Sequence, residues 1–413
     1  MSKILQQGKS QFAINLASNV AFFAISVVTS IWFIPYLIHH LGVATYGLIP
    51  LATTVTSYMT IITFALNIAV GRYMTIALEK SNDQEANRIF NTAFWGSAII
   101  AGILLVPGIF LIVYANHFFQ IPVGLEAEVR WLFAFAVAAF LITTIGSAFE
   151  MTSYCRNRFD LRNLVHIANL LTRIGSVVVF FHFSTANLFY VGLGIFLASL
   201  INLMGAILVS KRLLPFLAVR WEDFNLQVLK EMSGTGIWIF ISQIGTLLIL
   251  SIDLVVANRL LGAESTGQYA SVMQWSALLR NFAMVIAGVF GPTIVAYYAQ
   301  RNFEELVRYA RKSVKFVGLT IALPVGLICG FSKPLLYVWL GPDFVSLALL
   351  LVIMTFHLCL NLGYLPLHQI SMATNSVKWP AIMQIIVGIL NLGLAIFLAK
   401  IWGLYGIALA GGM

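Results

Sequence analysis

The sequence predicts an all-α polytopic membrane protein with about 12 transmembrane helices in two parallel six-helix lobes. The 413 residues are 60% hydrophobic and only 9% charged, and their mean hydropathy is +0.92. Soluble domains carry about 25% charged residues, because a folded surface in water needs them. Apolar runs of about 20 residues, enough to cross a bilayer, recur along the chain. Most Lys and Arg residues lie in short groups between these runs.

Twelve apolar segments are expected to span the membrane. The first lobe, residues 1–210, holds the segments 12–38, 46–78, 91–114, 130–152, 164–183 and 186–210. A cytoplasmic connector at 211–233 leads to the second lobe, 234–413, with the segments 234–258, 266–299, 314–331, 345–370, 380–399 and 402–413. The segments 46–78 and 266–299 exceed one span, so each is expected to include an interfacial turn or a tilt. The last helix is expected to be truncated, which would leave the second lobe incomplete.

The distribution of basic residues predicts a cytoplasmic N-terminus, because cytoplasmic loops of membrane proteins are enriched in Lys and Arg. Of the 24 Lys and Arg residues, 18 fall on the side of the N-terminus, four on the opposite side and two inside helices. The apolar stretch from Phe12 is too long for the core of a signal peptide and is expected to be a retained span. The charged, amphipathic segments 79–90, 210–233 and 300–313 are expected to lie along the cytoplasmic interface as connectors.

An internal repeat relates the two halves of the chain. A shift of 220 positions pairs the following residues: Leu41-Gly42 with Leu261-Gly262, Gly47 with Gly267, Gly71 with Gly291, Asn82 with Asn302, Glu85 with Glu305, and Arg88 with Arg308. Loop, helix and interfacial segment agree in order, which favours duplication. Parallel halves of this kind imply a pseudo-twofold axis along the membrane normal and a transporter that binds substrate between the halves.

Charged residues inside the predicted spans are the candidates for a substrate-binding cavity, since a charge at mid-membrane is costly without a cavity or partner. Arg280 and Arg173 lie deep in the eighth and fifth spans. The alternative for Arg280 is a structural ion pair with Asp253, itself a cavity candidate. Arg72 lies at the inner end of the second span, where snorkelling to the interface would explain it without a function. His357 is a candidate proton relay, although a hydrogen bond between helices is the commoner role of such a residue.

Several classes of function are excluded or disfavoured. The chain has no phosphate-binding Gly-Lys-Ser/Thr loop, no His-Glu-x-x-His and no Gly-x-Ser-x-Gly, so no enzymatic activity, metal or cofactor is expected. The three cysteines, Cys155, Cys329 and Cys359, lack metal-binding spacing and are expected to be reduced packing residues. The net charge of +9 does not indicate nucleic-acid binding, because no basic stripe is interleaved with exposed aromatic residues.

Several short motifs resemble the polysaccharide biosynthesis and export family, in particular Wzx-type flippases of the MOP superfamily, which also holds the MATE multidrug exporters. The residues that carry this resemblance are Asn15, Asn19, Pro35, Leu41-Gly42, Tyr46-Gly47, Arg72-Tyr73, Asp253, Leu261-Gly262, Gly267, Tyr269, Pro292 and Asn391-Leu392. The chain departs from the family in reading Phe64-Ala65-Leu66-Asn67 where relatives often carry an acidic residue and a glycine before the arginine of the second helix. It also stops inside the twelfth helix, where relatives continue.

The resemblance implies a MATE-like fold and a flippase of the bacterial cytoplasmic (inner) membrane, serving O-antigen, lipopolysaccharide or other surface polysaccharide synthesis. The implied substrate is an oligosaccharide repeat unit on undecaprenyl pyrophosphate, and deep arginines suit such an anion. Membrane lipids, a polysaccharide polymerase and a chain-length regulator are the further partners it implies. One alternative is a MATE-like cation-coupled multidrug exporter, which would prefer an acidic cavity. Another is a membrane enzyme of polymer assembly, which would need a catalytic cluster on an outer loop.

Overall fold

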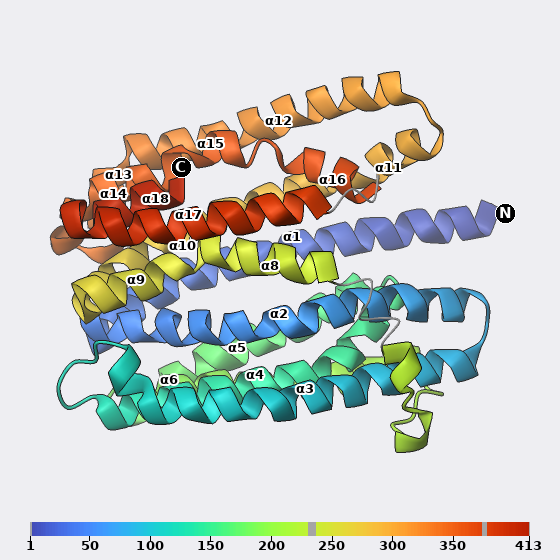
Figure 1. The fold of residues 1–413 in the computed structure, drawn as a ribbon, viewed down its shortest axis with the longest axis horizontal. Helices are drawn as coiled ribbons and strands as arrows, with labels where there is room; N and C mark the ends of the chain where they lie inside the picture. The colour runs from blue at the N-terminus through green and yellow to red at the C-terminus, as the bar shows by residue number, and fades with distance from the viewer. Residues whose placement is uncertain (1, 230–236, 374–377, 413) are drawn as a thin grey trace. The chain divides into compact units, whose positions relative to one another are not determined.

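The computed structural model describes residues 2–229, 237–373 and 378–412, and within these ranges it contains helices and turns but no β-strand (Figure 1). The end of the predicted connector and the start of the predicted seventh span lie outside the described residues. The all-α prediction is confirmed.

Six long helices form the first half of the chain and coincide with the six predicted spans. They are α1 (Ser2–Leu41), α2 (Val43–Glu79), α3 (Asp83–Phe118), α4 (Glu126–Cys155), α5 (Phe159–Phe183) and α6 (Leu188–Leu213). Local sequence signals mark the starts of two of these helices. The side chains of Asn82 and Asn187 accept hydrogen bonds from backbone N–H groups in the first turns of α3 and α6, which is the preferred way to satisfy a helix N-terminus.

The second half contains more and mostly shorter helices, because several of the predicted spans are each divided between two or three helices. They are α8 (Ile237–Leu250), α9 (Ile252–Leu261), α10 (Ala263–Gly288), α11 (Gly291–Ala299), α12 (Phe303–Gly330), α13 (Ser332–Leu340), α14 (Ala348–Phe356), α15 (Leu358–Asn361), α16 (Leu365–Ala373), α17 (Lys378–Trp402) and α18 (Leu404–Gly412). Two short 3₁₀ helices, η1 (Trp221–Asp223) and η2 (Pro342–Leu347), complete the described part.

Eight helical segments in the described ranges are long and apolar enough to cross a membrane, and a ninth is formed if the Phe240–Leu250 and Ile252–Leu261 helices count as one span bent by 41°. Their outer faces are apolar: Val106 on α3 is 70% exposed and Leu319 on α12 is 75% exposed. Such surface is unfavourable in water and favourable against lipid. The chain is therefore a multi-pass membrane protein.

The structure corrects three predictions about segment boundaries. Residues 83–90 and 303–313 are not separate interfacial connectors but the first turns of α3 and α12. At 1.5 Å per residue, the 36 residues of α3 exceed a hydrocarbon layer of about 30 Å, so its charged first turns extend beyond the layer. The segment 46–78 lies in one continuous helix, without the turn that was one of the two alternatives there. The segment 266–299 divides into α10 and α11, which agrees with the turn expected there. The segment 345–370 is interrupted around His357.

The internal repeat is visible in backbone geometry. Gly42 and Gly262 both end a helix with positive φ, at 81° and 94°. Asn82 and Asn302 occupy equivalent N-cap positions and accept hydrogen bonds from the N–H groups of Glu85 (3.0 Å) and Glu305 (3.2 Å). The residues before them, Ser81 and Arg301, are both left-handed, with φ of 53° and 55°. Matching cap geometry at a shift of 220 supports duplication more strongly than matching residue types.

A close approach of two helix starts explains one aligned glycine pair. A Cβ atom added to Gly47 in α2 would meet the backbone N of Gly267 in α10, and one added to Gly267 would meet the carbonyl O of Val43. Only glycine lets two backbones approach this closely. The aligned glycines therefore mark a contact between the two repeats.

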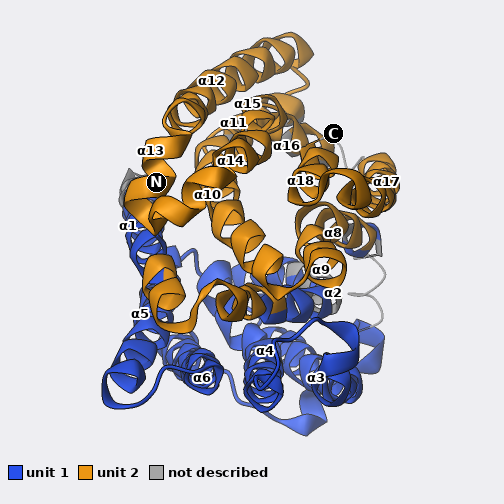
Figure 2. Cartoon of the chain, turned by 90° about the vertical axis from the view of Figure 1, so that its left-hand side faces the viewer, with its two compact units in different colours: residues 1–33, 52–240 blue, residues 34–51, 241–413 orange. Residues whose placement is uncertain are grey.

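The described chain divides into two compact units (Figure 2). Unit 1 consists of residues 1–33 and 52–240, and unit 2 of residues 34–51 and 241–413. Unit 1 has a buried cluster at one end of α2, α3 and α4, including Val70, Met74 and Phe90, against which Leu214 packs. Unit 2 has a buried cluster in which Leu279 of α10 packs with residues of α12 and α15.

Candidate functional site

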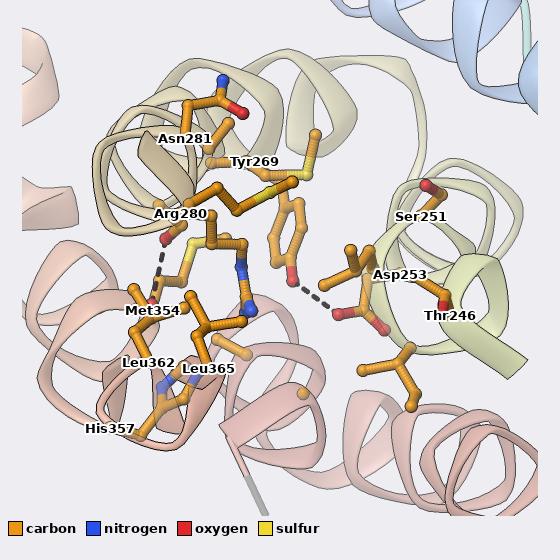
Figure 3. Close-up of a pocket in the computed structure, with 18 residues that line it drawn as sticks. Thr246, Ser251, Asp253, Tyr269, Arg280, Asn281, Met354, His357, Leu362 and Leu365 are labelled. Atoms are coloured by element: carbon orange, nitrogen blue, oxygen red, sulfur yellow. Dashed lines mark hydrogen bonds between the residues drawn. The ribbon is translucent and has the colours of Figure 1, made fainter. Parts of the chain in front are cut away.

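A cavity of 490 Å³ lies within unit 2 (Figure 3). Its lining comes from α8, α9, α10, α14, α16 and α18, and from the turns before and after α15. About half of these side chains are apolar, and apolar atoms supply most of the lining surface. The polar residues that reach the cavity are Thr246, Ser251, Asp253, Tyr269, Ser276, Arg280, Asn281 and His357. A mostly apolar pocket with a few convergent polar groups is the usual form of a small-molecule site.

Two interrupted helices border this cavity. The first is the bend between α8 and α9 at Ser251, two residues before Asp253. The second is the break at His357, where α14 ends and the chain continues through α15 and a turn to α16. Breaks at membrane depth expose backbone groups and are tolerated where they line a cavity or are buried in protein. In transporters, such discontinuous helices typically form the substrate or ion site.

Asp253 is buried at 6% exposure and is held by two uncharged donors. The Tyr269 hydroxyl donates to its Oδ2 at 3.0 Å, and the Asn391 amide donates to its Oδ1 at 3.3 Å. Asn391 also donates to the carbonyl O of Leu248 at 3.2 Å. The Asp253 carboxylate is thus positioned by neighbours from α10 and α17.

Arg280 projects from α10 into the same cavity (Figure 3). Over the described ranges it makes no hydrogen bond and no ion pair within 4.0 Å, so the predicted alternative of an ion pair with Asp253 is not formed. A guanidinium carries five N–H donors and binds carboxylate or phosphate through two of them. Arg280 therefore offers unused donors to an anionic ligand.

His357 lies at the break after α14 and also lines the cavity. Its Nδ1 is 3.2 Å from the carbonyl O of Ile353, which requires the proton on Nδ1, and its Nε2 is buried without a partner. Nε2 is then an acceptor that faces no protein donor. Its predicted role as a proton relay stays a prediction.

The other two predicted site residues lie in unit 1. Arg173 is on α5, and its Nε is buried with no hydrogen-bond partner. Arg72 is on α2, and its side chain is exposed. Neither lines the cavity of unit 2. Their roles in substrate binding stay predictions.

Several cavity features were not predicted as site residues. Tyr269 and Asn391 were singled out only for their resemblance to a family, and their hydrogen bonds to Asp253 join residues 16 and 138 positions apart. No local periodicity signals such contacts. Helix α18 also lies close to this site: a Cβ atom added to Gly411 would lie 2.9 Å from Asp253 Oδ2. The Gly-Gly pair at 411–412 was the only sequence signal of that close approach.

Comparisons with known proteins identify the family. The profile described as "Polysaccharide biosynthesis protein" matches residues 12–298. The membrane protein EpsK of Bacillus subtilis (strain 168) is 33% identical over 403 residues, which cover 97% of this chain and 80% of EpsK. Among solved structures, an inward-facing MATE-family multidrug resistance transporter of the MOP superfamily aligns with a TM-score of 0.67, 14% identity, and 98% and 91% coverage of the two chains. A mutant of the Vibrio cholerae MATE transporter VcmN aligns with a TM-score of 0.65, 14% identity, and 99% and 93% coverage.

These matches agree with the all-α, multi-pass pattern of the chain. At such low identity the solved structures show the fold alone, and they show a MATE-like one. The family is shown independently by the profile match and by EpsK. The chain belongs to the polysaccharide biosynthesis protein family and has a MATE-like fold.

Proposed function

We propose that the protein is a flippase that moves undecaprenyl-pyrophosphate-linked oligosaccharide repeat units across the cytoplasmic membrane for surface polysaccharide synthesis, by alternating access. Family and fold indicate a transporter rather than a catalytic enzyme. The observation that carries the finer proposal is the Arg280 guanidinium, which lines a mostly apolar cavity with no protein acceptor over the described ranges. Charge-assisted hydrogen bonds from such a group suit a pyrophosphate.

The proposed topology places the N-terminus in the cytoplasm, on the side with most Lys and Arg residues. The substrate then moves from the inner to the outer leaflet. An inside-negative potential favours outward movement of negative charge by about 2.3 kcal/mol per charge per 100 mV. In this scheme the headgroup crosses through the protein while the apolar prenyl tail stays in lipid. A polysaccharide polymerase and a chain-length regulator are the proposed partners after release.

One observation favours a second function. Asp253 lines the same cavity, and a buried carboxylate could take a coupling cation or help bind a cationic compound. That arrangement would suit a cation-coupled multidrug exporter, and the solved MATE transporters share the fold. The hydrogen bonds from Tyr269 and Asn391 weaken this alternative, because they already take one acceptor site on each carboxylate oxygen.

Reconstitution of the full chain into liposomes separates the two functions. A fluorescent undecaprenyl-pyrophosphate oligosaccharide is placed in both leaflets, and a membrane-impermeant quencher reports how fast the inner-leaflet label becomes accessible. The flippase proposal expects exchange well above that of protein-free liposomes. It also expects no acceleration for a phosphatidylcholine with the same label, since that headgroup has no net charge for a cationic cavity to select.

In the same liposomes, transport of a fluorescent organic cation across the membrane is measured under an imposed Na⁺ or H⁺ gradient. Gradient-driven cation movement without exchange of the lipid-linked sugar would contradict the flippase proposal and support the exporter. Equal exchange of the lipid-linked sugar and of phosphatidylcholine would contradict both, because it would indicate unspecific lipid scrambling.

A further inference from the structure

A second hollow of unit 2 lies between α12 and α16, and it forms a groove with a volume of 1040 Å³. Its lining includes Val307, Arg311, Lys312 and Lys315 from the first half of α12, and Leu367 and Ile370 from α16. It shares no lining residue with the cavity around Arg280. The groove combines a basic rim with an apolar wall.

Three of the basic groups in this groove are not neutralised by protein. Arg308 is ion-paired with Glu304 at 3.0 Å and Glu305 at 3.1 Å. No ion pair within 4.0 Å is formed by Arg311, Lys312 or Lys315 in the part of the chain that the structure describes, and all three side chains are exposed. Lys315 is four residues from Arg311 and three from Lys312, so it neighbours both on the helix surface. Together they present three positive charges.

The equivalent surface of the first repeat is covered. In unit 1, Asn87 of α3 accepts from the N–H of Ala218 at 3.0 Å and donates to Asp223 at 2.7 Å. Asn91 donates to the carbonyl O of Ala218 at 2.8 Å and accepts from the N–H of Arg220 at 2.7 Å. Side chains of α3 thus bind the segment 218–225, mainly through its backbone.

Further along the same face, Thr92 accepts from the N–H of Asn225 at 3.2 Å, and the Trp95 indole donates to the carbonyl O of Arg220 at 3.3 Å. Apolar side chains just before this segment, including Leu214 and Leu217, pack in or against the buried cluster that contains Phe90. In the first repeat, this face of α3 is therefore occupied by the protein's own chain.

In α12, the residues that lie 220 positions after these four contact residues are all of a different type. Asn87, Asn91, Thr92 and Trp95 correspond to Val307, Arg311, Lys312 and Lys315. Guanidinium and ammonium groups have no acceptor atom, so they cannot accept the backbone N–H groups that Asn91 and Thr92 accept. The side chains of α12 therefore cannot accept these two backbone hydrogen bonds, and they carry charge that an anion would neutralise.

We propose that this groove is a binding site for the phosphate headgroup of an anionic phospholipid of the bilayer. Past Lys315, the exposed face of α12 becomes apolar: Leu319 and Leu323 are 75% and 68% exposed. The basic turns therefore lie where the helix leaves the hydrocarbon layer, at the depth of lipid phosphates. Basic residues at this position attract anionic lipids, and basic pockets between helices bind their headgroups. The acyl chains extend along the apolar face.

Native mass spectrometry of the full chain in detergent tests the site with phosphatidylglycerol, cardiolipin and phosphatidylethanolamine. The test variant is Arg311→Gln/Lys312→Gln/Lys315→Gln. The matched control, Lys80→Gln/Lys211→Gln/Arg212→Gln, removes the same charge from exposed positions of unit 1. We expect the wild type and the control to retain phosphatidylglycerol and cardiolipin over phosphatidylethanolamine. The test variant should lose at least about tenfold in affinity for both anionic lipids, because each removed cation weakens the attraction to anionic headgroups.

Three results would overturn the proposal. One is unchanged anionic-lipid binding by the test variant when its thermal unfolding matches that of the wild type. Another is an equal loss in the control, which would mean that total charge and not the groove determines binding. The third is stronger retention of undecaprenyl phosphate than of phosphatidylglycerol at this site, which would assign the groove to a substrate lipid. If the triple variant does not fold, the double variant Lys312→Gln/Lys315→Gln, which keeps Arg311, replaces it.

Discussion

At the scale of single residues, the cavity of unit 2 is notable for polar atoms that the protein leaves unsatisfied. Arg280 has no acceptor over the described ranges, and His357 Nε2 is buried without a partner. A buried polar group without a hydrogen bond costs about 1–3 kcal/mol. Such groups are typical of a site that a ligand or water completes. The sequence predicted Arg280, Asp253 and His357 as candidates because charge at membrane depth is rare.

The contacts among these residues could not be predicted in the same way. Asp253 lies near Arg280 in the expected helices, and opposite charges suggested a pair. The structure instead holds Asp253 with Tyr269 and Asn391, which leaves Arg280 available. The choice between a salt bridge and neutral donors depends on side-chain directions of three helices, which hydropathy does not encode.

Removal of the Tyr269 hydroxyl tests whether Asp253 depends on it. We expect Tyr269→Phe to lower the free energy of unfolding by about 1.5–3 kcal/mol, because a hydrogen bond to a buried charged group is lost. Thermal unfolding in detergent, followed by tryptophan fluorescence, measures this. Tyr405→Phe is the matched control: its hydroxyl donates to the carbonyl O of Ser346 at 3.2 Å in an exposed place, so it should change little. Equal changes in the thermal unfolding of the two variants would show that the hydrogen bond to Asp253 stabilises the protein no more than an exposed one.

At the scale of helices, the sequence predicted where the chain is apolar but not where helices break. The segment 345–370 stays apolar through His357, so a hydropathy criterion sees one span. The structure divides it into α14, α15 and α16. For the charged segments 79–90 and 300–313 the error was the opposite one: a break was predicted where most of each segment belongs to a continuous helix. Their polarity suggested separate connectors, yet Asn82 and Asn302 cap helices that run from there through the membrane.

The paired caps yield a matched prediction for the two repeats. Asn82→Ala and Asn302→Ala should each cost about 0.5–2 kcal/mol, since each removes the acceptor for an N–H in the first turn of a long helix. Because the geometries match, the two losses should be similar, and the double variant should be additive for caps in separate units. Hydrogen exchange of the first turns of α3 and α12 measures the local effect. Faster exchange in only one helix would mean that the repeats are not equivalent there.

At the scale of the whole molecule, composition was sufficient to predict a polytopic all-α protein, because 9% charged residues cannot cover a surface in water. The repeat was detectable because cap residues and turn glycines keep their identity when lipid-facing positions drift. The asymmetry between the repeats was not detectable, since it depends on which face of α3 the segment 218–225 covers. The location of the lobe boundary and the membrane orientation stay predictions.

Cysteine labelling tests the predicted orientation. In a variant with Cys155, Cys329 and Cys359 replaced by serine, Ser81→Cys follows the second span and Ser184→Cys follows the fifth. With the N-terminus in the cytoplasm, a membrane-impermeant maleimide added to intact cells should label position 184 and not position 81. The positive-inside distribution is the physical reason. Labelling of position 81 alone would reverse the orientation, and with it the direction of proposed transport.

The most direct test of the central claim, that Arg280 binds the anionic headgroup during flipping, is the rate of leaflet exchange of the undecaprenyl-pyrophosphate oligosaccharide by Arg280 variants in liposomes. We predict that Arg280→Gln slows exchange roughly 10–100-fold, the equivalent of about 1.5–3 kcal/mol for a charge-assisted hydrogen bond. Arg280→Lys keeps the charge but not the paired donors, so its exchange rate should lie between those of the wild type and Arg280→Gln. Arg88→Gln, an exposed arginine 3.8 Å from Glu85, is the control and should match the wild type. Undiminished exchange by a folded, inserted Arg280→Gln protein would contradict the claim.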